Sequence, residues 1–212
     1  MQGRFITVEG TDGAGKTTQI EFVRDYLTSL GISCVLTREP GGTAIGEAIR
    51  ELLLRRSDLH VTSRAQLLLV FAARAQHIEE IIAPSLARGD WVVCDRFTDA
   101  TYAYQGGAGN LGFDAVAAVE NWVQGTFRPD LTLLFDVPVE TGFARVCRRG
   151  ADGDRFEILG IEQKNRIRNA YLQLAERHPD RIVVIDAIPD IETVSSHVAR
   201  VLDAHITRWR DQ

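Results

Sequence analysis

The chain has 212 residues, of which 45% are hydrophobic, so it is long enough to bury the core of one domain spanning 1–212. Its net charge of -5 argues against a general binder of nucleic acid or of anionic membranes. The start of the chain shows no apolar signal segment, and the longest apolar run, at 67–73, is too short to span a bilayer, so we expect a cytoplasmic protein with no membrane partner.

Runs rich in β-branched residues alternate with helical stretches along the chain. They are FITVE at 5–9, SCVLT at 33–37, WVVCD at 91–95, LTLLFDV at 131–137 and RIVVID at 181–186. This alternation predicts an α/β fold, a five-stranded parallel sheet with helices on both faces. The segment from Thr62 to Arg88 predicts one long helix, broken only near Pro84. Because apolar residues cover much of its surface, we expect it to pack both in the core and against a second copy, in a homodimer.

The stretch GTDGAGKTT follows the first strand directly and matches the phosphate-loop pattern GxxxxGK[ST]. Its glycines let successive amide groups turn inward, its lysine reaches the outer phosphates of a nucleotide, and the next hydroxyl can bind magnesium. The residues expected to bind ATP are Gly10, Thr11, Asp12, Gly13, Ala14, Gly15, Lys16, Thr17 and Thr18.

Asp12 is unexpected in this loop, because a carboxylate repels phosphates. Two interpretations remain open from the residues. The side chain at the apex of the loop either faces outward to a second substrate, or caps the loop through a local backbone hydrogen bond.

A phosphate loop is shared by nucleotide switches, motor ATPases and small kinases. A guanine-nucleotide switch is expected to carry an NKxD-type motif, which this sequence lacks, and a motor ATPase is usually larger. A small kinase needs a second site for a phosphate acceptor, close to the first.

Arginines mark the positions where that acceptor site is expected, after strands of the sheet. Arg38 follows the second strand, and Arg96 follows Asp95 at the end of the third. A guanidinium group suits phosphate and carbonyl oxygens. Arg50 and Arg74 lie on predicted helices, either as solvated surface charges or as part of the same crevice.

Four segments together resemble bacterial thymidylate kinases, members of the phosphate-loop nucleoside monophosphate kinase family. They are GTDGAGKTT, TREPGGT at 37–43, CDRFTDATYAYQGG at 94–107 and DRFE at 154–157, and the resemblance covers nearly the whole chain. It implies a phosphate-loop kinase core with a short lid at about 148–160 and a homodimeric assembly. It also implies that ATP with Mg²⁺ phosphorylates dTMP to dTDP, leaving ADP, in the dTTP synthesis pathway.

The resemblance also implies roles for individual residues. Arg96 and Arg38 would bind the dTMP phosphate with Arg50 nearby, and Arg74 would reach a thymine carbonyl oxygen. Thr101 and Gln105 would lie near the base, Tyr104 beneath the sugar, and Asp12 beside its 3′-hydroxyl. Thr17 and Asp95 would belong to the magnesium shell. Relatives often place a thymine-stacking aromatic where this chain has Val70, so Phe71 next to it is either the stacking ring or a core phenylalanine.

Phosphoryl transfer needs cations over the moving group, and the acceptor phosphate needs no general base. Positions 11–14 of the phosphate loop contain no arginine, so the resemblance implies a catalytic arginine in the lid, with Arg149 and Arg155 as candidates beside Lys16 and Arg96. The five histidines lack ligand spacing, and we expect them on solvated faces or loop ends. Two rival functions remain: a kinase for another nucleoside monophosphate, and a nucleotide-binding regulator.

Overall fold

The computed structural model describes residues 3–56, 58–149 and 159–210. Its strands form a five-stranded parallel sheet, as the alternation of strand and helix predicted, and each begins and ends within one residue of the run that predicted it. The strands are β1 (Phe5–Gly10), β2 (Cys34–Arg38), β3 (Trp91–Asp95), β4 (Leu131–Asp136) and β5 (Ile182–Asp186).

The first strand of the chain lies in the middle of the sheet, in the order β2-β3-β1-β4-β5. The chain therefore moves outward from β1 to β2, returns to β3 and then crosses β1 to reach β4. In a parallel sheet, a crevice for ligands opens at the carboxyl ends of the strands where the chain changes direction. The last residue of β2, Arg38, pairs in register with Asp95 of β3, and Asp95 pairs with Val8 of β1. Polar residues at the carboxyl ends of these three strands are thus brought close together.

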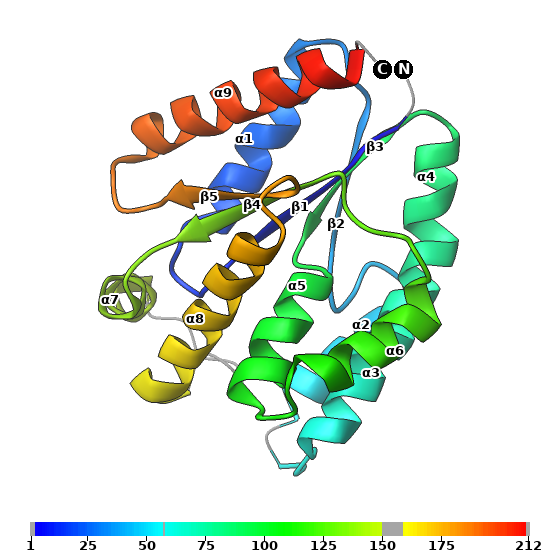
Figure 1. Cartoon of the computed structure of the whole chain (residues 1–212), viewed down its shortest axis with the longest axis vertical. Coiled ribbons are helices and arrows are strands. Elements are labelled where there is room, and N and C mark those ends of the chain that lie inside the picture. The colour runs from blue at the N-terminus through cyan, green and yellow to red at the C-terminus, as the bar shows by residue number, and fades with distance from the viewer. Residues whose placement is uncertain (1–2, 57, 150–158, 211–212) are drawn as a thin grey trace.

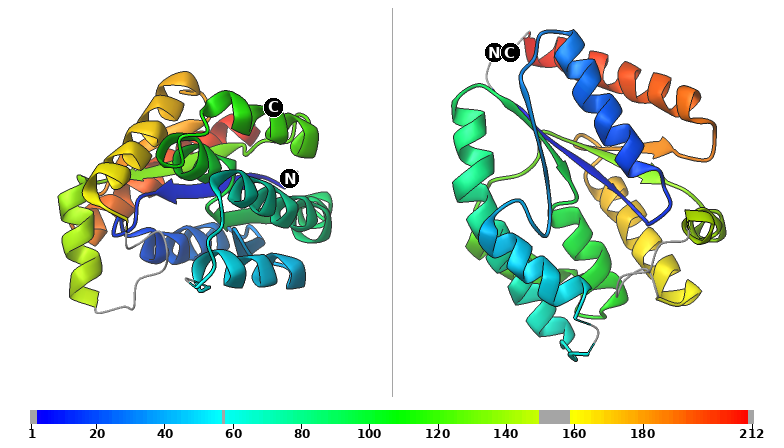
Figure 2. Two further views of the ribbon diagram at one scale, coloured as in Figure 1. Left: turned by 90° about the horizontal axis from the view of Figure 1, so that it is seen from below. Right: turned by 180° about the vertical axis from the view of Figure 1, so that it is seen from behind.

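Helices cover both faces of the sheet (Figure 1). On one face α1 (Lys16–Ser29) packs beside α9 (Ile191–Arg210), and on the other lie α5 (Thr98–Thr101) and α8 (Ile161–Arg177). In the left view of Figure 2, α1 and α8 lie on opposite sides of the strands. Burial of apolar side chains between each helical layer and the sheet is the main force that holds the layers together.

Of the remaining helices, α4 contacts β3 on the inner part of the sheet. Among them α2 contacts α3, and α3 contacts α6. Their bounds are α2 (Ala44–Leu54), α3 (Ser63–His77), α4 (Ala83–Ala87), α6 (Phe113–Gln124) and α7 (Val139–Arg149).

The helix predicted from Thr62 to Arg88 is present, but it changes from α-helical to π-helical hydrogen bonding before Pro84, where the sequence predicted a break. Thr62 caps α3 by accepting a hydrogen bond from the Ala65 amide. A π-helical segment, η1 (Ile78–Ile82), then leads directly into α4, whose second residue is Pro84. Proline has no amide hydrogen to donate, and the wider turn lets the Ala83 amide bond to the Ile78 carbonyl instead. The chain therefore stays helical through Pro84.

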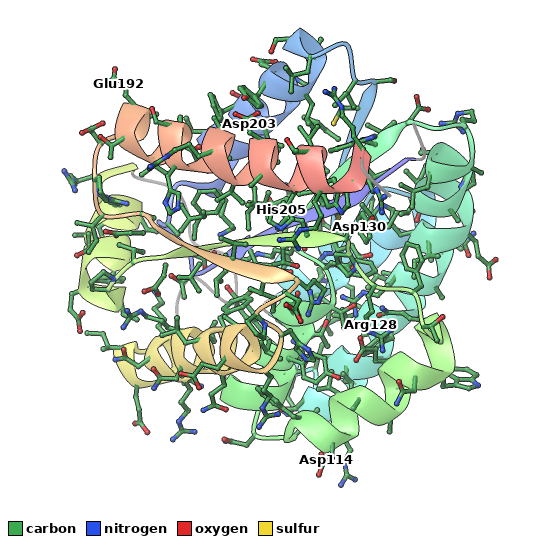
Figure 3. All side chains as sticks on the ribbon, turned by 45° about the horizontal axis from the view of Figure 1, so that its top comes forward. Asp114, Arg128, Asp130, Glu192, Asp203 and His205 are labelled. Carbon is green, nitrogen blue, oxygen red and sulfur yellow. The ribbon has the colours of Figure 1, made fainter. Side chains whose placement is uncertain are left out.

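The amino ends of β1 and β4 are tied by Asp130, which is labelled in Figure 3. Its carboxylate accepts hydrogen bonds from Arg4 at 2.9 Å and from the Phe5 amide at 2.7 Å. These hydrogen bonds hold β1 and β4 together at the end of the sheet opposite the carboxyl ends of the strands. Across the described part of the chain, none of the helices combines the length and apolarity needed to cross a membrane.

Candidate active site

The phosphate loop connects β1 to α1, as the sequence predicted. Gly13 and Gly15 adopt left-handed backbone angles, with φ of 81° and 84°. A Cβ atom on Gly13 would lie 2.1 Å from the carbonyl oxygen of Gly142 in α7, whereas one on Gly15 would meet nothing within 4 Å. Glycine is therefore required at position 13 both by the backbone angle and by the close approach of α7.

Lys16, the first residue of α1, folds back over the loop. Its ammonium group donates hydrogen bonds to the carbonyl oxygens of Gly10 and Thr11, both at 3.0 Å. Burial, together with the nearby charge of Arg96, lowers the pKa of Lys16 to about 8. A lysine in this position can exchange its carbonyl partners for the phosphates of a nucleotide.

Arg96 follows β3 and reaches across to the phosphate loop. Its Nη2 donates to Asp12 Oδ1 at 2.6 Å, and its Nη1 donates to the Gly10 carbonyl at 3.0 Å and the Tyr171 hydroxyl at 3.2 Å. The Tyr104 ring lies against the guanidinium, 5.0 Å from its centroid to Cζ. Arg96 is thus the bridge between the residues that follow β1 and β3.

The carboxylate of Asp12 is surrounded by cations. Burial by itself would raise the pKa of Asp12, but the charges of Arg96, Lys16 and Lys164 and a hydrogen bond from Tyr104 outweigh burial, and the pKa lies below its usual value. Asp12 is therefore ionised at neutral pH and turned toward Arg96. This arrangement explains how a phosphate loop tolerates a carboxylate, since neighbouring cations neutralise its charge.

A second buried cluster lies behind Arg74 of α3. Its Nε donates to Glu39 Oε2 at 2.8 Å, and the other oxygen of Glu39 is 2.9 Å from Nδ1 of His77. The side chains of Arg74 and Glu39 are 1% and 2% exposed, and that of His77 is 0% exposed. The expectation that the histidines lie on solvated faces is therefore wrong for His77, because a carboxylate partner satisfies its ring inside the protein. It is wrong for His205 as well, which is buried on α9 and bonded to the Val201 carbonyl (Figure 3).

A cavity of about 330 Å³ joins the phosphate loop to the Arg74 cluster. It brings together most of the side chains singled out in the sequence. The predicted site residues that line it are Asp12, Gly13, Gly15, Lys16, Thr17, Thr18, Arg50, Arg74, Asp95, Arg96, Thr101, Tyr104 and Gln105.

Several predicted site residues lie outside the cavity lining. Gly10, Thr11 and Ala14 form the buried back of the phosphate loop. Arg38 points to solvent and pairs with Glu47 at 3.0 Å, with 53% of its side chain exposed. Arg149 ends α7, and Arg155 lies outside the described residues, as does most of the proposed lid.

Phe71 also lies outside the cavity lining. It is 1% exposed and packs with Leu67 and with Val116 of α6, while its neighbour Val70 faces the cavity. Its ring lies against the guanidinium of Arg74, 4.7 Å from its centroid to Cζ. The structure thus places Phe71 behind the arginine, in the core position that was one of its two interpretations.

Comparison with known proteins identifies the family. The family model described as thymidylate kinase matches residues 8–198. The chain belongs to the thymidylate kinase family. It is 51% identical to the thymidylate kinase of Alkalilimnicola ehrlichii over 208 residues, covering 98% of this chain and 96% of that protein. It is 50% identical to the thymidylate kinase of Pseudomonas putida strain GB-1 over 210 residues, covering 99% and 100% of the two chains.

A solved structure agrees with this assignment. The crystal structure of thymidylate kinase from Ehrlichia chaffeensis is similar with a TM-score of 0.78 at 35% identity, covering 96% of this chain and 99% of that one. The α/β phosphate-loop kinase fold is thereby confirmed. As a member of the thymidylate kinase family, the chain is an ATP-dependent phosphotransferase.

Within this thymidylate kinase fold, Glu9 is a site residue that the sequence analysis missed. One of its oxygens accepts a hydrogen bond from the Phe97 amide at 2.6 Å, and the other from the Tyr171 hydroxyl at 2.8 Å. Tyr171 in turn contacts Arg96, so Glu9 supports that arginine from the side facing the core. Burial, and the charge of Asp99, raise the pKa of Glu9 to about 8. The sequence carries a signal for Glu9, because a charged residue is rarely fully buried near the end of a strand unless it is paired.

Proposed function

We propose that the chain transfers the γ-phosphoryl group of ATP to dTMP, giving dTDP and ADP, with ATP on the phosphate loop and dTMP in the adjoining cavity. The observation that carries this proposal is the single cavity that extends from Lys16 and Thr17 to Arg74 and Gln105, with the Asp12–Arg96 ion pair between them. Two phosphorylated substrates placed at its two ends meet beside Arg96. Alignment of two phosphates is most of what phosphoryl transfer requires.

On the ATP side, the amides of the phosphate loop and the ammonium of Lys16 hold the phosphates. Thr17 and Asp95 are proposed as the residues that hold Mg²⁺. In support, both line the cavity, and Asp95 Oδ1 is a buried oxygen that has no hydrogen-bond partner among the described residues. Hydroxyl and carboxylate oxygens suit this ion. When bound, magnesium neutralises charge on the outer phosphates of ATP.

On the acceptor side, Arg96 binds the dTMP phosphate, with Arg50 nearby. Arg74 donates to a carbonyl oxygen of the base, with Thr101 and Gln105 close to it, and Tyr104 lies beneath the sugar. The acceptor phosphate has a second pKa of about 6, so it is largely a dianion at neutral pH. It therefore attacks without a general base, and the arginines orient it while limiting repulsion between the two phosphates.

The segment at about 148–160 is proposed as a lid. Its arginines, Arg149 or Arg155, would bring a cation to the transferring group when the site closes. This division of labour fits a phosphate loop that has no arginine at positions 11–14.

We also propose that the protein is a cytoplasmic homodimer. Leu68 of α3 and Trp122 of α6 are 60% and 86% exposed on two helices that contact each other. Large apolar side chains on adjacent elements favour a protein interface.

A coupled assay of ADP release tests the function. It compares dTMP with dUMP, UMP, CMP and AMP as acceptors at saturating ATP. We expect ADP release that depends on the acceptor, with the highest kcat/KM for dTMP. A preference for another monophosphate would make the chain a kinase of that nucleotide, and ADP release independent of every acceptor would favour a nucleotide-binding regulator.

A further inference from the structure

The guanidinium of Arg74 is fixed inside the protein on several sides. Its Nε donates to Glu39 and its Nη2 donates to the Thr101 hydroxyl at 2.9 Å. Two phenyl rings enclose it, with the centroid of Phe71 4.7 Å and that of Phe97 4.9 Å from Cζ. These contacts leave the group a single orientation.

The remaining nitrogen of this guanidinium, Nη1, is unsatisfied. It is buried and has no hydrogen-bond partner among the residues that the structure describes. Arg74, Thr101 and Gln105 all line the cavity. Because a buried donor is normally paired, Nη1 marks a place where a ligand brings a hydrogen-bond acceptor.

Behind Arg74, a chain of hydrogen bonds runs back to β2. A carboxylate oxygen only accepts, so Nδ1 of His77 donates to Glu39 at 2.9 Å. Nε2 of His77 lies 2.6 Å from the Thr37 hydroxyl at the other end of the ring. The backbone of Gly42 closes over this contact, since a Cβ there would lie 2.6 Å from Nε2 and 2.7 Å from Oγ1 of Thr37. Three residues of the TREPGGT segment, Thr37, Glu39 and Gly42, therefore help to hold Arg74 in place.

We propose that Glu39, His77 and Thr37 are positioning residues that aim Arg74 at the acceptor base and so set its selectivity for a pyrimidine with a carbonyl oxygen. The inference rests on the proposed function, which places the base beside Arg74. A carbonyl oxygen accepts from Nη1, whereas the amino group of a cytosine ring opposes one N–H with another. A guanidinium that could turn would accommodate both, so discrimination depends on the groups that hold it.

The test compares two acceptors, dTMP and 5-methyl-dCMP, which differ at the base edge that carries either a carbonyl or an amino group. Glu39→Gln removes the charge that holds Arg74, and Thr37→Val removes the last hydroxyl of the chain of hydrogen bonds. We expect KM for dTMP to rise while KM for ATP stays unchanged. The ratio of kcat/KM for the two acceptors should fall about tenfold in Glu39→Gln and by a smaller factor in Thr37→Val.

The matched control is Thr132→Val, which also removes a buried hydroxyl. Thr132 is 0% exposed and bonds to Thr7 at 2.7 Å and to Arg181 at 2.8 Å, away from the cavity. It should lower stability and leave the acceptor ratio unchanged. If Glu39→Gln and Thr37→Val likewise lose only stability, the three residues are structural and the inference is wrong.

Arg74→Met separates this inference from the proposed function. If Arg74→Met leaves the acceptor ratio unchanged, Arg74 does not contact the base and the proposed acceptor site is wrong. If Arg74→Met removes discrimination and Glu39→Gln does not, the contact stands and the positioning role fails. If Arg74→Met and Glu39→Gln each reduce the discrimination between the two acceptors, the double variant should discriminate no worse than Arg74→Met alone, because Glu39 acts through Arg74.

Discussion

The carboxylate of Asp12 lies 2.6 Å from the guanidinium of Arg96 and joins the middle of the phosphate loop to the end of β3. A second bond from Arg96 to the Gly10 carbonyl, at 3.0 Å, ties the arginine to the start of the same loop. The group proposed to bind the acceptor phosphate is therefore held by the loop proposed to bind ATP. Whatever displaces the loop also displaces the arginine.

Asp12→Ala should impair the acceptor side of the reaction more than the ATP side. The carboxylate orients Arg96 and can accept a hydrogen bond from the 3′-hydroxyl of dTMP, and a hydrogen bond to a charged group contributes roughly 1.5–3 kcal/mol. We expect kcat/KM for dTMP to fall about ten- to a hundredfold, with ATP affinity nearly unchanged. Steady-state kinetics and ATP titration measure the two effects.

A 3′-deoxy acceptor separates the two roles of Asp12. If the sugar hydroxyl is bound, this acceptor loses less than dTMP on the Asp12→Ala change. An equal loss for both acceptors would leave only the contact with Arg96, and a parallel collapse of ATP binding would show that Asp12 shapes the loop.

Tyr104→Ala should relax selectivity against ribonucleotides. Tyr104 lies in the π-helical segment η2 (Tyr102–Ala108) and is 8% exposed. Its side chain lines the cavity and packs on Arg96. Its removal opens space where a 2′-hydroxyl would lie, so the ribonucleotide to dTMP ratio of kcat/KM should rise about tenfold. Tyr104→Phe keeps the ring and is the control; a ratio that rises equally in both variants would contradict steric exclusion.

Glu9 should make stability depend on pH in a recognisable way. Its pKa is raised from 4.5 to about 8 by burial and by Asp99. The carboxyl group of Glu9 therefore binds a proton more tightly in the folded protein than in the unfolded chain. Its contribution to stability is therefore complete below about pH 4.5 and is lost as pH rises through about 8. Urea unfolding of wild type and Glu9→Gln at several pH values measures the difference. The variant should lack this decline, and parallel curves for the two proteins would refute the assignment.

Gly13→Ala and Gly15→Ala form a matched pair within one loop. Both residues have left-handed backbone angles, which cost a non-glycine residue about 1–2 kcal/mol. Only at Gly13 would the added Cβ also clash with the Gly142 carbonyl oxygen, at a distance of 2.1 Å. We expect a clearly larger loss of unfolding free energy for Gly13→Ala, together with weaker ATP binding because the loop must move away from α7. Equal losses of stability would mean that the contact with α7 is not tight.

The strands and the phosphate loop could be read from the sequence because their signals are local. A run such as WVVCD predicts a strand through its own side chains, and the glycines and Lys16 of the loop are adjacent along the chain. Partners that meet across the sheet have no local signal. His77 lies 38 positions from Glu39, and only the folded chain shows that the two are bonded.

The rotation of α3 about its own axis is a second feature that the sequence does not predict. Its residues from Leu67 to Phe71 are all apolar, so the sequence does not fix which side of the helix faces the cavity. One step along a helix turns the side chain by about 100°. That single step separates Val70, which lines the cavity, from Phe71, which packs toward α6.

The backbone of Arg96 carries a consequence for how far this protein can be stabilised. Its φ of 66° lies in the left-handed region, which disfavours any residue with a Cβ. The local conformation that turns the side chain back toward the phosphate loop thus opposes the preference of the residue itself. Arg96→Gly should unfold at a higher temperature than Arg96→Ala, by an amount that corresponds to about 1 kcal/mol, although both variants lack the guanidinium. The backbone conformation at this position therefore favours glycine, whereas the bonds of the guanidinium to the phosphate loop and to Tyr171 favour arginine.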